Sequence, residues 1–145
     1  MDSILTREEI EKIIPHRDPI LLVDEVLEME DGVSIVTKYH VSAQLDIFRG
    51  HFPNEPIFPG VYTIECMAQA SAVLALSMES YAGRLPLFLG VDKVSFKAKV
   101  TPGSDLIVSS TIVEHKAEKA IVICSSEVFL GDNLVATASI ALALR

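Results

Sequence analysis

Apolar and polar residues alternate along much of the chain, and this alternation predicts strands in two blocks. The first block covers residues 20–29 and 34–41, with the hairpin signal Asp31-Gly32 between them. The second block is interrupted only by turn residues, and its predicted strands are residues 86–96, 105–115, 120–130 and 134–144. Because little helix separates these strands, we expect them to form an antiparallel sheet.

A different pattern occupies residues 60–80, where apolar residues follow one another without alternation. The length of this stretch and its near lack of charge predict one long helix that is covered on most sides. A membrane span is disfavoured, because Glu65 and Gln69 would then lie at bilayer depth, where a charge costs several kcal/mol. A sheet wrapped around one long helix is an α+β architecture.

Two further segments complete the predicted fold. Thr6 or Ser3 can cap a short helix that runs to about residue 14, where a proline follows. Residues 42–59 form a long, partly irregular connection, and loops of that length in compact domains are usually functional. No repeat or linker interrupts the pattern, so we expect a single domain over residues 1–145.

Composition and charge narrow the classes of function. Hydrophobic residues make up 50% of the chain and the net charge is −8, which predicts a folded protein whose main partner is not nucleic acid. Cys66 and Cys124 lie in apolar runs, which favours buried free thiols over a disulfide. Residues 1–9 lack the basic start and apolar core of a signal peptide, so we expect a cytoplasmic protein.

The first candidate for chemistry is His51, which stands in a proline-rich loop. Pro53, Pro56 and Pro59 stiffen this loop and would fix the histidine before a substrate arrives. A neutral imidazole is a suitable general base near pH 7. The plain alternative is a loop histidine that only forms a hydrogen bond with the backbone.

The predicted long helix supplies the other candidates. Burial of Glu65 among apolar neighbours would favour the neutral carboxylic acid, which can donate a proton, and Gln69 lies one turn further on the same face and could orient it. Gly60 would present a backbone N–H without a helical partner to a carbonyl oxygen that gains charge. A surface-paired glutamate and an ordinary helix-start glycine are the plain alternatives. Together with His51, these groups fit β-elimination of water beside a carbonyl, or its reverse.

One segment is basic although the chain as a whole is acidic; it contains Arg84, Lys93, Lys97 and Lys99. This segment could steer an acidic partner protein, although solvated side chains on a strand explain it equally well. The remaining histidines show no metal-ligand spacing with the cysteines, and no nucleotide-binding or GxSxG motif is present. Metal binding is therefore disfavoured.

Three blocks of the sequence resemble one known family. The motif HFPNEPIFPGV at residues 51–61, followed by Glu65 and Gln69, is similar to the β-hydroxyacyl-acyl-carrier-protein dehydratases of FabZ type. The motif IPHRDPILLVD at residues 14–24 resembles the family's N-terminal block. The motif GVDKVSFK at residues 90–97 resembles its third strand. The similarity covers nearly the whole chain in order.

The resemblance implies a hot-dog fold, in which a curved antiparallel sheet wraps a long central helix. It implies homodimers, often assembled as trimers of dimers, with active sites at the dimer interface. The substrate would be a (3R)-3-hydroxyacyl chain on the phosphopantetheine arm of acyl carrier protein, and the product a trans-2-enoyl chain. The carrier is acidic, so the resemblance favours carrier docking by the basic segment.

By motif position, the resemblance assigns His51 as the base and Glu65 as the acid, with Gly60 polarising the thioester carbonyl. It places Gly60, Val61, Gln69 and Phe52 at the substrate, and it implies neither a metal nor a separate cofactor. The related dehydratase-isomerases carry Asp where this chain has Glu65, so the resemblance favours a pure dehydratase.

Two alternatives to a dehydratase stay open on the sequence alone. A hot-dog thioesterase would use water as its nucleophile and release a free acid. A catalytically silent acyl-binding module is disfavoured, because such a module has no need to retain His51, Gly60 and Glu65 together. The acyl chain length stays open as well, as does the use of the product in membrane lipid, lipid A or secondary metabolism.

Overall fold

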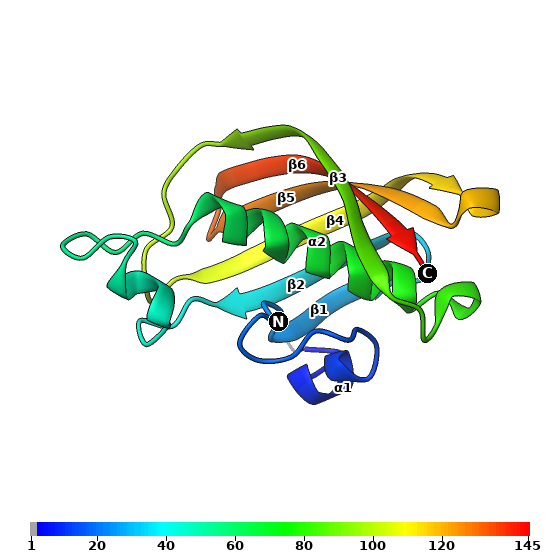
Figure 1. The fold of residues 1–145 in the computed structure, drawn as a ribbon, viewed down its shortest axis with the longest axis horizontal. Helices are drawn as coiled ribbons and strands as arrows, with labels where there is room; N and C mark the ends of the chain where they lie inside the picture. Colours follow the sequence, from blue (N-terminus) through cyan, green and yellow to red (C-terminus); the bar gives the residue numbers. More distant parts are fainter. Residues whose placement is uncertain (1–2) are drawn as a thin grey trace.

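The computed structural model describes residues 3–145 as one antiparallel sheet and one long helix (Figure 1). The first two residues of the N-terminal stretch considered above lie outside the described residues. The sheet has six strands in the order β1-β2-β4-β5-β6-β3, and all neighbouring strands are antiparallel. The strands are β1 Glu25–Glu30, β2 Ser34–His40, β3 Pro86–Phe96, β4 Asp105–Lys116, β5 Ile121–Leu130 and β6 Asn133–Leu144.

Helix α2, Gly60–Leu76, runs across one face of the sheet, which curves around it (Figure 1). Every residue from 66 to 76 is buried, because the helix packs against several strands along this length. Alanines at positions 68, 70, 72 and 75 let the sheet approach the helix closely. The expected α+β fold with a long central helix is therefore confirmed, and its arrangement is that of a hot-dog fold.

The remaining elements are short. They are α1 Arg7–Glu11 and three single turns, η1 Asp46–Arg49, η2 Glu79–Tyr81 and η3 Ala117–Lys119. Thr6 caps α1 through a reciprocal pair of hydrogen bonds with Glu9, so one of the two predicted caps is confirmed. The helix ends at Glu11 and not near residue 14, and the Arg17 guanidinium donates to carbonyl oxygens in the turn that follows.

The prediction of a strand from residue 20 was wrong, because β1 begins only at Glu25. Backbone groups of residues 20–22 bond to the side chain of Gln69 from α2 instead of to a neighbouring strand. Helix α2 also ends earlier than predicted, at Leu76. Ser77 forms its C-cap and donates its hydroxyl to the Val73 carbonyl oxygen at 2.6 Å, and the chain then turns into η2.

The cysteine prediction is confirmed. Cys66 and Cys124 are both free and buried. Burial raises the pKa of both thiols above the ordinary value for cysteine, so neither has the character of a reactive thiolate.

Strand β3 is an edge of the sheet and carries many exposed apolar side chains. With the residue just before it, the strand exposes Leu85, Leu87, Phe88, Leu89, Val91, Val94 and Phe96. It pairs on one side only, with β6, so the backbone groups on its other side have no strand partner within residues 3–145. An edge that is both apolar and unpaired is a typical contact surface for another chain.

No helix among residues 3–145 is long and apolar enough to cross a membrane. Within the same residues, no group of three or more His, Cys, Asp and Glu side chains is arranged to hold a metal ion.

Candidate active site

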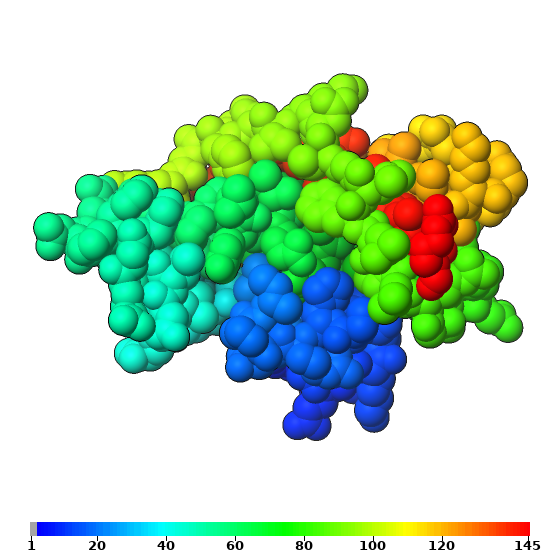
Figure 2. Space-filling view, viewed as in Figure 1, coloured from blue at the N-terminus to red at the C-terminus, as the bar shows by residue number. Residues whose placement is uncertain are grey.

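The loop between β2 and α2 is anchored by aromatic side chains. Phe48 and Phe58 are buried and face each other with ring centroids 6.5 Å apart, while Tyr39 and Tyr62 pack on Phe58 at 6.1 and 5.7 Å. The Phe58 N–H also donates to the Val100 carbonyl oxygen at 2.8 Å. These contacts fix the base of a loop that projects from one end of the molecule (Figure 2).

His51 lies within this loop and is fixed by its own hydrogen bonds. Its Nδ1 lies 2.7 Å from the Ile57 carbonyl oxygen, and the Ile57 N–H donates back to the His51 carbonyl oxygen at 3.0 Å. Its ring stacks on Phe52, with centroids 4.0 Å apart. A carbonyl oxygen only accepts, so Nδ1 carries the hydrogen and the neutral ring has its lone pair on Nε2. The hydrogen bond of His51 to the backbone is therefore compatible with a role of His51 as general base.

Gly60 begins α2 directly after Pro59, which provides no side-chain cap. Among residues 3–145, no group accepts a hydrogen bond from the Gly60 N–H. This donor lies at the positive end of the helix dipole and is suited to an oxygen that gains negative charge.

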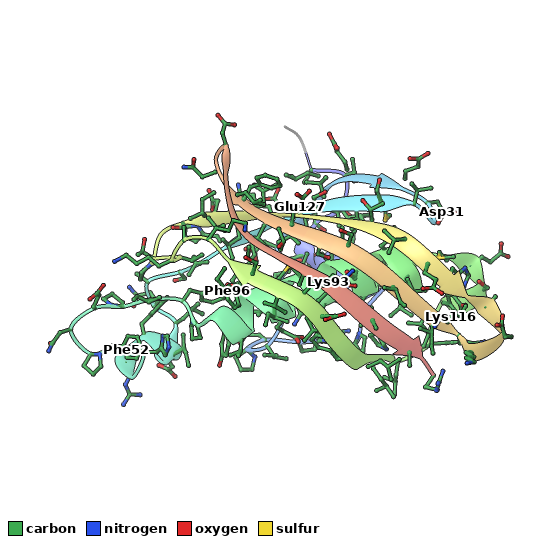
Figure 3. All side chains as sticks on the ribbon, turned by 90° about the horizontal axis from the view of Figure 1, so that it is seen from above. Asp31, Phe52, Lys93, Phe96, Lys116 and Glu127 are labelled. Atoms are coloured by element: carbon green, nitrogen blue, oxygen red, sulfur yellow. The ribbon has the colours of Figure 1, made fainter. Side chains whose placement is uncertain are left out.

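Packing in the folded chain requires a glycine at position 60, which the sequence alone does not show. A Cβ atom at this position would lie 2.9 Å from the ring of Phe96, at the end of β3 (Figure 3). The Phe96 ring thus fills the space beside the Gly60 Cα. A hollow of about 230 Å³ adjoins both residues, and Lys99 lines it as well.

Glu65 is held by Gln69, which is fully buried. Gln69 Nε2 donates to Glu65 Oε2 at 2.7 Å and to the Ile20 carbonyl oxygen at 2.7 Å. Its Oε1 accepts from the Leu22 N–H at 2.7 Å. No Lys or Arg within residues 3–145 pairs with Glu65, and the nearest cationic candidate is His16, whose Nε2 lies 3.7 Å from Oε2. The structure therefore does not support the alternative that Glu65 pairs with a surface Lys or Arg.

Because Gln69 is fully buried and bonds to three groups at once, its loss should be costly. We expect Gln69→Leu to lower the free energy of unfolding by about 3 kcal/mol, since the Ile20 carbonyl and Leu22 N–H would lose their partners. Urea denaturation measures this change. The exposed Gln44 provides the matched control, and Gln44→Leu should change stability by less than about 0.5 kcal/mol. Equal stability of the two variants would contradict this role for Gln69.

Gly60, the candidate N–H donor, and Glu65, the candidate acid, occupy different sides of α2. Gly60 and Glu65 are five positions apart, which places them about 140° apart around the helix axis. Gly60 faces Phe96 near β3, whereas Glu65 faces residues 16–22, which cover the other side of the helix (Figures 1 and 2). No hydrogen bond or ion pair joins His51 to Glu65 in the part of the chain that the structure describes.

Comparison with known proteins identifies the family. Residues 14–139 match the model of the FabA-like domain family. A 3-hydroxyacyl-[acyl-carrier-protein] dehydratase FabZ of Desulforamulus reducens is 43% identical over 135 residues, which cover 93% of this chain and 94% of the relative. The chain belongs to the FabZ family. The resemblance seen in its three sequence blocks is thereby confirmed.

Solved structures agree on the fold of this FabZ-family chain. A chain of the dehydratase heterocomplex ApeI:P from Xenorhabdus doucetiae superposes with a TM-score of 0.75 at 20% identity, covering 94% of this chain and 90% of that one. A hypothetical thioesterase with coenzyme A from Streptococcus pneumoniae gives 0.65 at 14% identity, covering 83% and 84%. Dehydratases and thioesterases share this fold, so the fold alone does not choose between the two activities.

The FabZ-family chain also has a cavity next to the segment that binds Gln69. This cavity has a volume of about 250 Å³ and is lined mainly by apolar side chains, among them Ile20, Leu22, Leu45 and Tyr62. Ile20 and Leu22 are also the residues whose backbone binds Gln69, which in turn donates to Glu65.

The basic residues of this FabZ-family chain do not form one cluster. Arg84 lies two residues before β3 and Lys97 directly follows it, so the length of the 11-residue strand separates them. Lys93 lies between these ends (Figure 3). Lys97 and Lys99 lie at the end of β3 nearest the His51 loop, and Lys99 Nζ pairs with Glu55 Oε2 of that loop at 3.0 Å.

The predicted substrate contacts differ in exposure. Phe52 and Val61 are exposed at 48% and 68% and could contact a ligand, whereas Gln69 is fully buried and reaches a substrate only through Glu65. Phe96 and His16 were missed as site residues, although both lie in the sequence blocks that resemble the family.

Proposed function

We propose that this chain dehydrates (3R)-3-hydroxyacyl groups carried on acyl carrier protein, giving trans-2-enoyl products in type II fatty-acid synthesis. One observation carries the proposal. His51 and Glu65 each have one polar atom occupied by a neighbour within the chain, and the other atom is left for a substrate. The Ile57 carbonyl occupies Nδ1 of His51, and Gln69 occupies Oε2 of Glu65.

The proposed reaction begins at the carbon next to the thioester carbonyl. His51 Nε2 takes a proton from this carbon, and the Gly60 N–H stabilises the negative charge that develops on the carbonyl oxygen. The electron pair of the broken C–H bond forms the carbon–carbon double bond. The C–O bond to the 3-hydroxyl breaks, and Glu65 donates its proton so that water leaves. The histidine ends protonated and Glu65 ends as a carboxylate, so a return of one proton resets the site.

We propose that a second copy of the chain completes the site. One substrate must contact the Gly60 end of α2 and the carboxyl group of Glu65, which lie on different sides of the helix in one chain. The apolar edge strand β3 supports a homodimer, because pairing of two β3 strands would cover exposed side chains such as Leu87, Leu89 and Val91. A trimer of such dimers is the assembly that the family resemblance favours.

The acyl chain and its carrier would occupy different surfaces. The apolar cavity lined by Ile20 and Leu22 is a suitable seat for an acyl chain, since burial of each methylene contributes about 0.8 kcal/mol. Lys97 and Lys99 are the candidate docking residues for the acidic carrier, because they lie near the His51 loop. Local positive charge is needed there, since the net charge of −8 would otherwise repel an acidic partner.

Product formation from a 3-hydroxyacyl-carrier substrate tests the proposed function. We expect mass spectrometry to detect the enoyl product with the wild type and to find almost none with His51→Ala, because the α-proton then has no base. His40→Ala is the matched control, since His40 lies on the sheet and pairs with Asp105. Release of free carrier thiol in place of the enoyl product would show a thioesterase. Absence of both products across short and long acyl chains would favour a silent acyl-binding module.

A further inference from the structure

We propose that His16 is a positioning residue for the acid: together with Gln69 it holds one oxygen of Glu65, so that the other oxygen presents the proton to the substrate. This inference rests on the proposed dehydratase function, since it assigns a partner to the acid of that reaction. His16 belongs to the block at residues 14–24. The proposed reaction, with its base and its acid, assigns no role to this histidine.

The contact is made to one carboxyl oxygen only. His16 Nε2 lies 3.7 Å from Glu65 Oε2, the same atom that accepts the hydrogen bond of Gln69 Nε2 at 2.7 Å. Within residues 3–145, no group donates to Oε1 of Glu65. The two neighbours thus fix the rotation of the carboxyl group and leave Oε1 as the atom that can carry the proton.

Hydrogen bonds to the backbone on both sides of His16 fix the loop that carries its ring. On one side, the Arg17 guanidinium donates to the carbonyl oxygens of Glu11, Ile14 and His16, at 2.7, 2.9 and 2.7 Å. On the other side, Gln69 binds the backbone of residues 20 and 22. Only 20% of the ring is exposed, so packing restricts it further.

The hydrogen-bonding pattern of the ring indicates its tautomer. Nδ1 is buried and has no hydrogen-bond partner within the part of the chain that the structure describes, whereas Nε2 faces a carboxyl oxygen. The neutral form with its hydrogen on Nε2 fits best, because the one N–H then faces an acceptor and the bare Nδ1 needs no acceptor. At 3.7 Å the contact is not yet a hydrogen bond. Catalytic contacts of this kind often shorten when substrate binds and charge develops.

This geometry serves the acid step of the reaction. When Glu65 gives its proton to the leaving hydroxyl, negative charge develops on the carboxyl group. Two N–H groups, from Gln69 and His16, then face Oε2 and stabilise that charge where it forms.

The charge state of His16 agrees with this role. Burial lowers the pKa of His16, and the charge of Arg17 lowers it further, whereas the Glu65 carboxylate raises it. These are the two charged groups that act on the ring, one from its own loop and one from α2. A pKa below 6.5 keeps the ring neutral at pH 7, so it does not lock Glu65 as the carboxylate before the reaction. As the pH falls through that pKa, the charged ring would favour the carboxylate, and turnover should fall.

Substitutions of His16 test the proposal through kinetics. We expect His16→Phe, which keeps a ring without a donor, to lower kcat by about 10-fold to 100-fold with little change in KM. His16→Gln carries an amide N–H of similar reach and should recover most of the wild-type kcat, without the loss of turnover that protonation of His16 causes at low pH. His40→Gln, on the sheet, is the matched control and should behave as wild type. A wild-type kcat for His16→Phe, or equal loss in the Phe and Gln variants, would overturn the proposal.

A second measurement does not depend on activity. The chain has four histidines, so NMR can follow the ring nitrogens of His16 individually in the assembled protein. In Glu65→Gln the chemical shift of His16 Nε2 should change, because an amide replaces the carboxyl group whose oxygen lies 3.7 Å away. Glu127→Gln should leave that shift as in the wild type. An unchanged shift in Glu65→Gln would refute the contact, even where a His16 variant fails to fold. Absence of enoyl product from the wild type would instead refute the proposed function, and the chemical shift would still decide the contact.

Discussion

Glu65→Gln is expected to lower kcat by about 10²-fold to 10⁴-fold, the range of a lost general acid. The amide is nearly isosteric with the acid, but it has no proton to give to the leaving hydroxyl. Gln69 can still bond to an amide oxygen, so the loop at residues 20–22 should stay in place. We therefore expect unchanged folding, a KM close to that of the wild type, and loss of turnover with any 3-hydroxyacyl-carrier substrate.

The control for this variant is the same chemical change elsewhere. Glu127 is exposed on β5 (Figure 3), and Glu127→Gln should leave kcat unchanged. Circular dichroism and thermal unfolding verify that both variants are folded. Near-normal turnover of Glu65→Gln would show that another group donates the proton, and the role assigned to Glu65 would be wrong.

The main elements of the fold could be predicted because local patterns determine them. Alternation marks the strands of the second block, and the uninterrupted apolar run marks α2. The prediction of a strand before β1 failed for a physical reason. Residues 20–22 are as apolar as a strand, yet the side chain of Gln69 bonds to the Ile20 carbonyl oxygen and the Leu22 N–H from outside the sheet. A glutamine 47 residues from Leu22 in sequence leaves no trace in the local pattern of that segment.

The candidate site could likewise be predicted only where nearby residues determine it. His51, Gly60 and Glu65 could be proposed from residue type and spacing, since loop stiffness and helix position follow from nearby residues. Phe96 and His16 could not, because each acquires its place from a contact with α2 that forms only in the folded chain. The strand pattern at residues 86–96 predicted β3 correctly. It did not show that the strand lies at an edge with its apolar side chains exposed.

The placement of Gly60 and Glu65 on different sides of α2 leads to a prediction about mixed assemblies. If each site takes His51 from one chain and Glu65 from its partner, His51→Ala and Glu65→Gln are both inactive alone. A dimer of one chain of each kind has one site with both substitutions and one site with neither. Random mixing makes about half of the dimers mixed, so activity should recover to about a quarter of the wild-type value.

The mixing experiment has a strict control. The two variants are unfolded together and refolded, and native mass spectrometry verifies that mixed dimers have formed. Mixing His51→Ala with the double variant His51→Ala/Glu65→Gln should restore nothing, because no chain then supplies an intact histidine. Recovery in the first mixture alone would establish a site shared between two chains. No recovery in verified mixed dimers would mean that each chain holds a complete site.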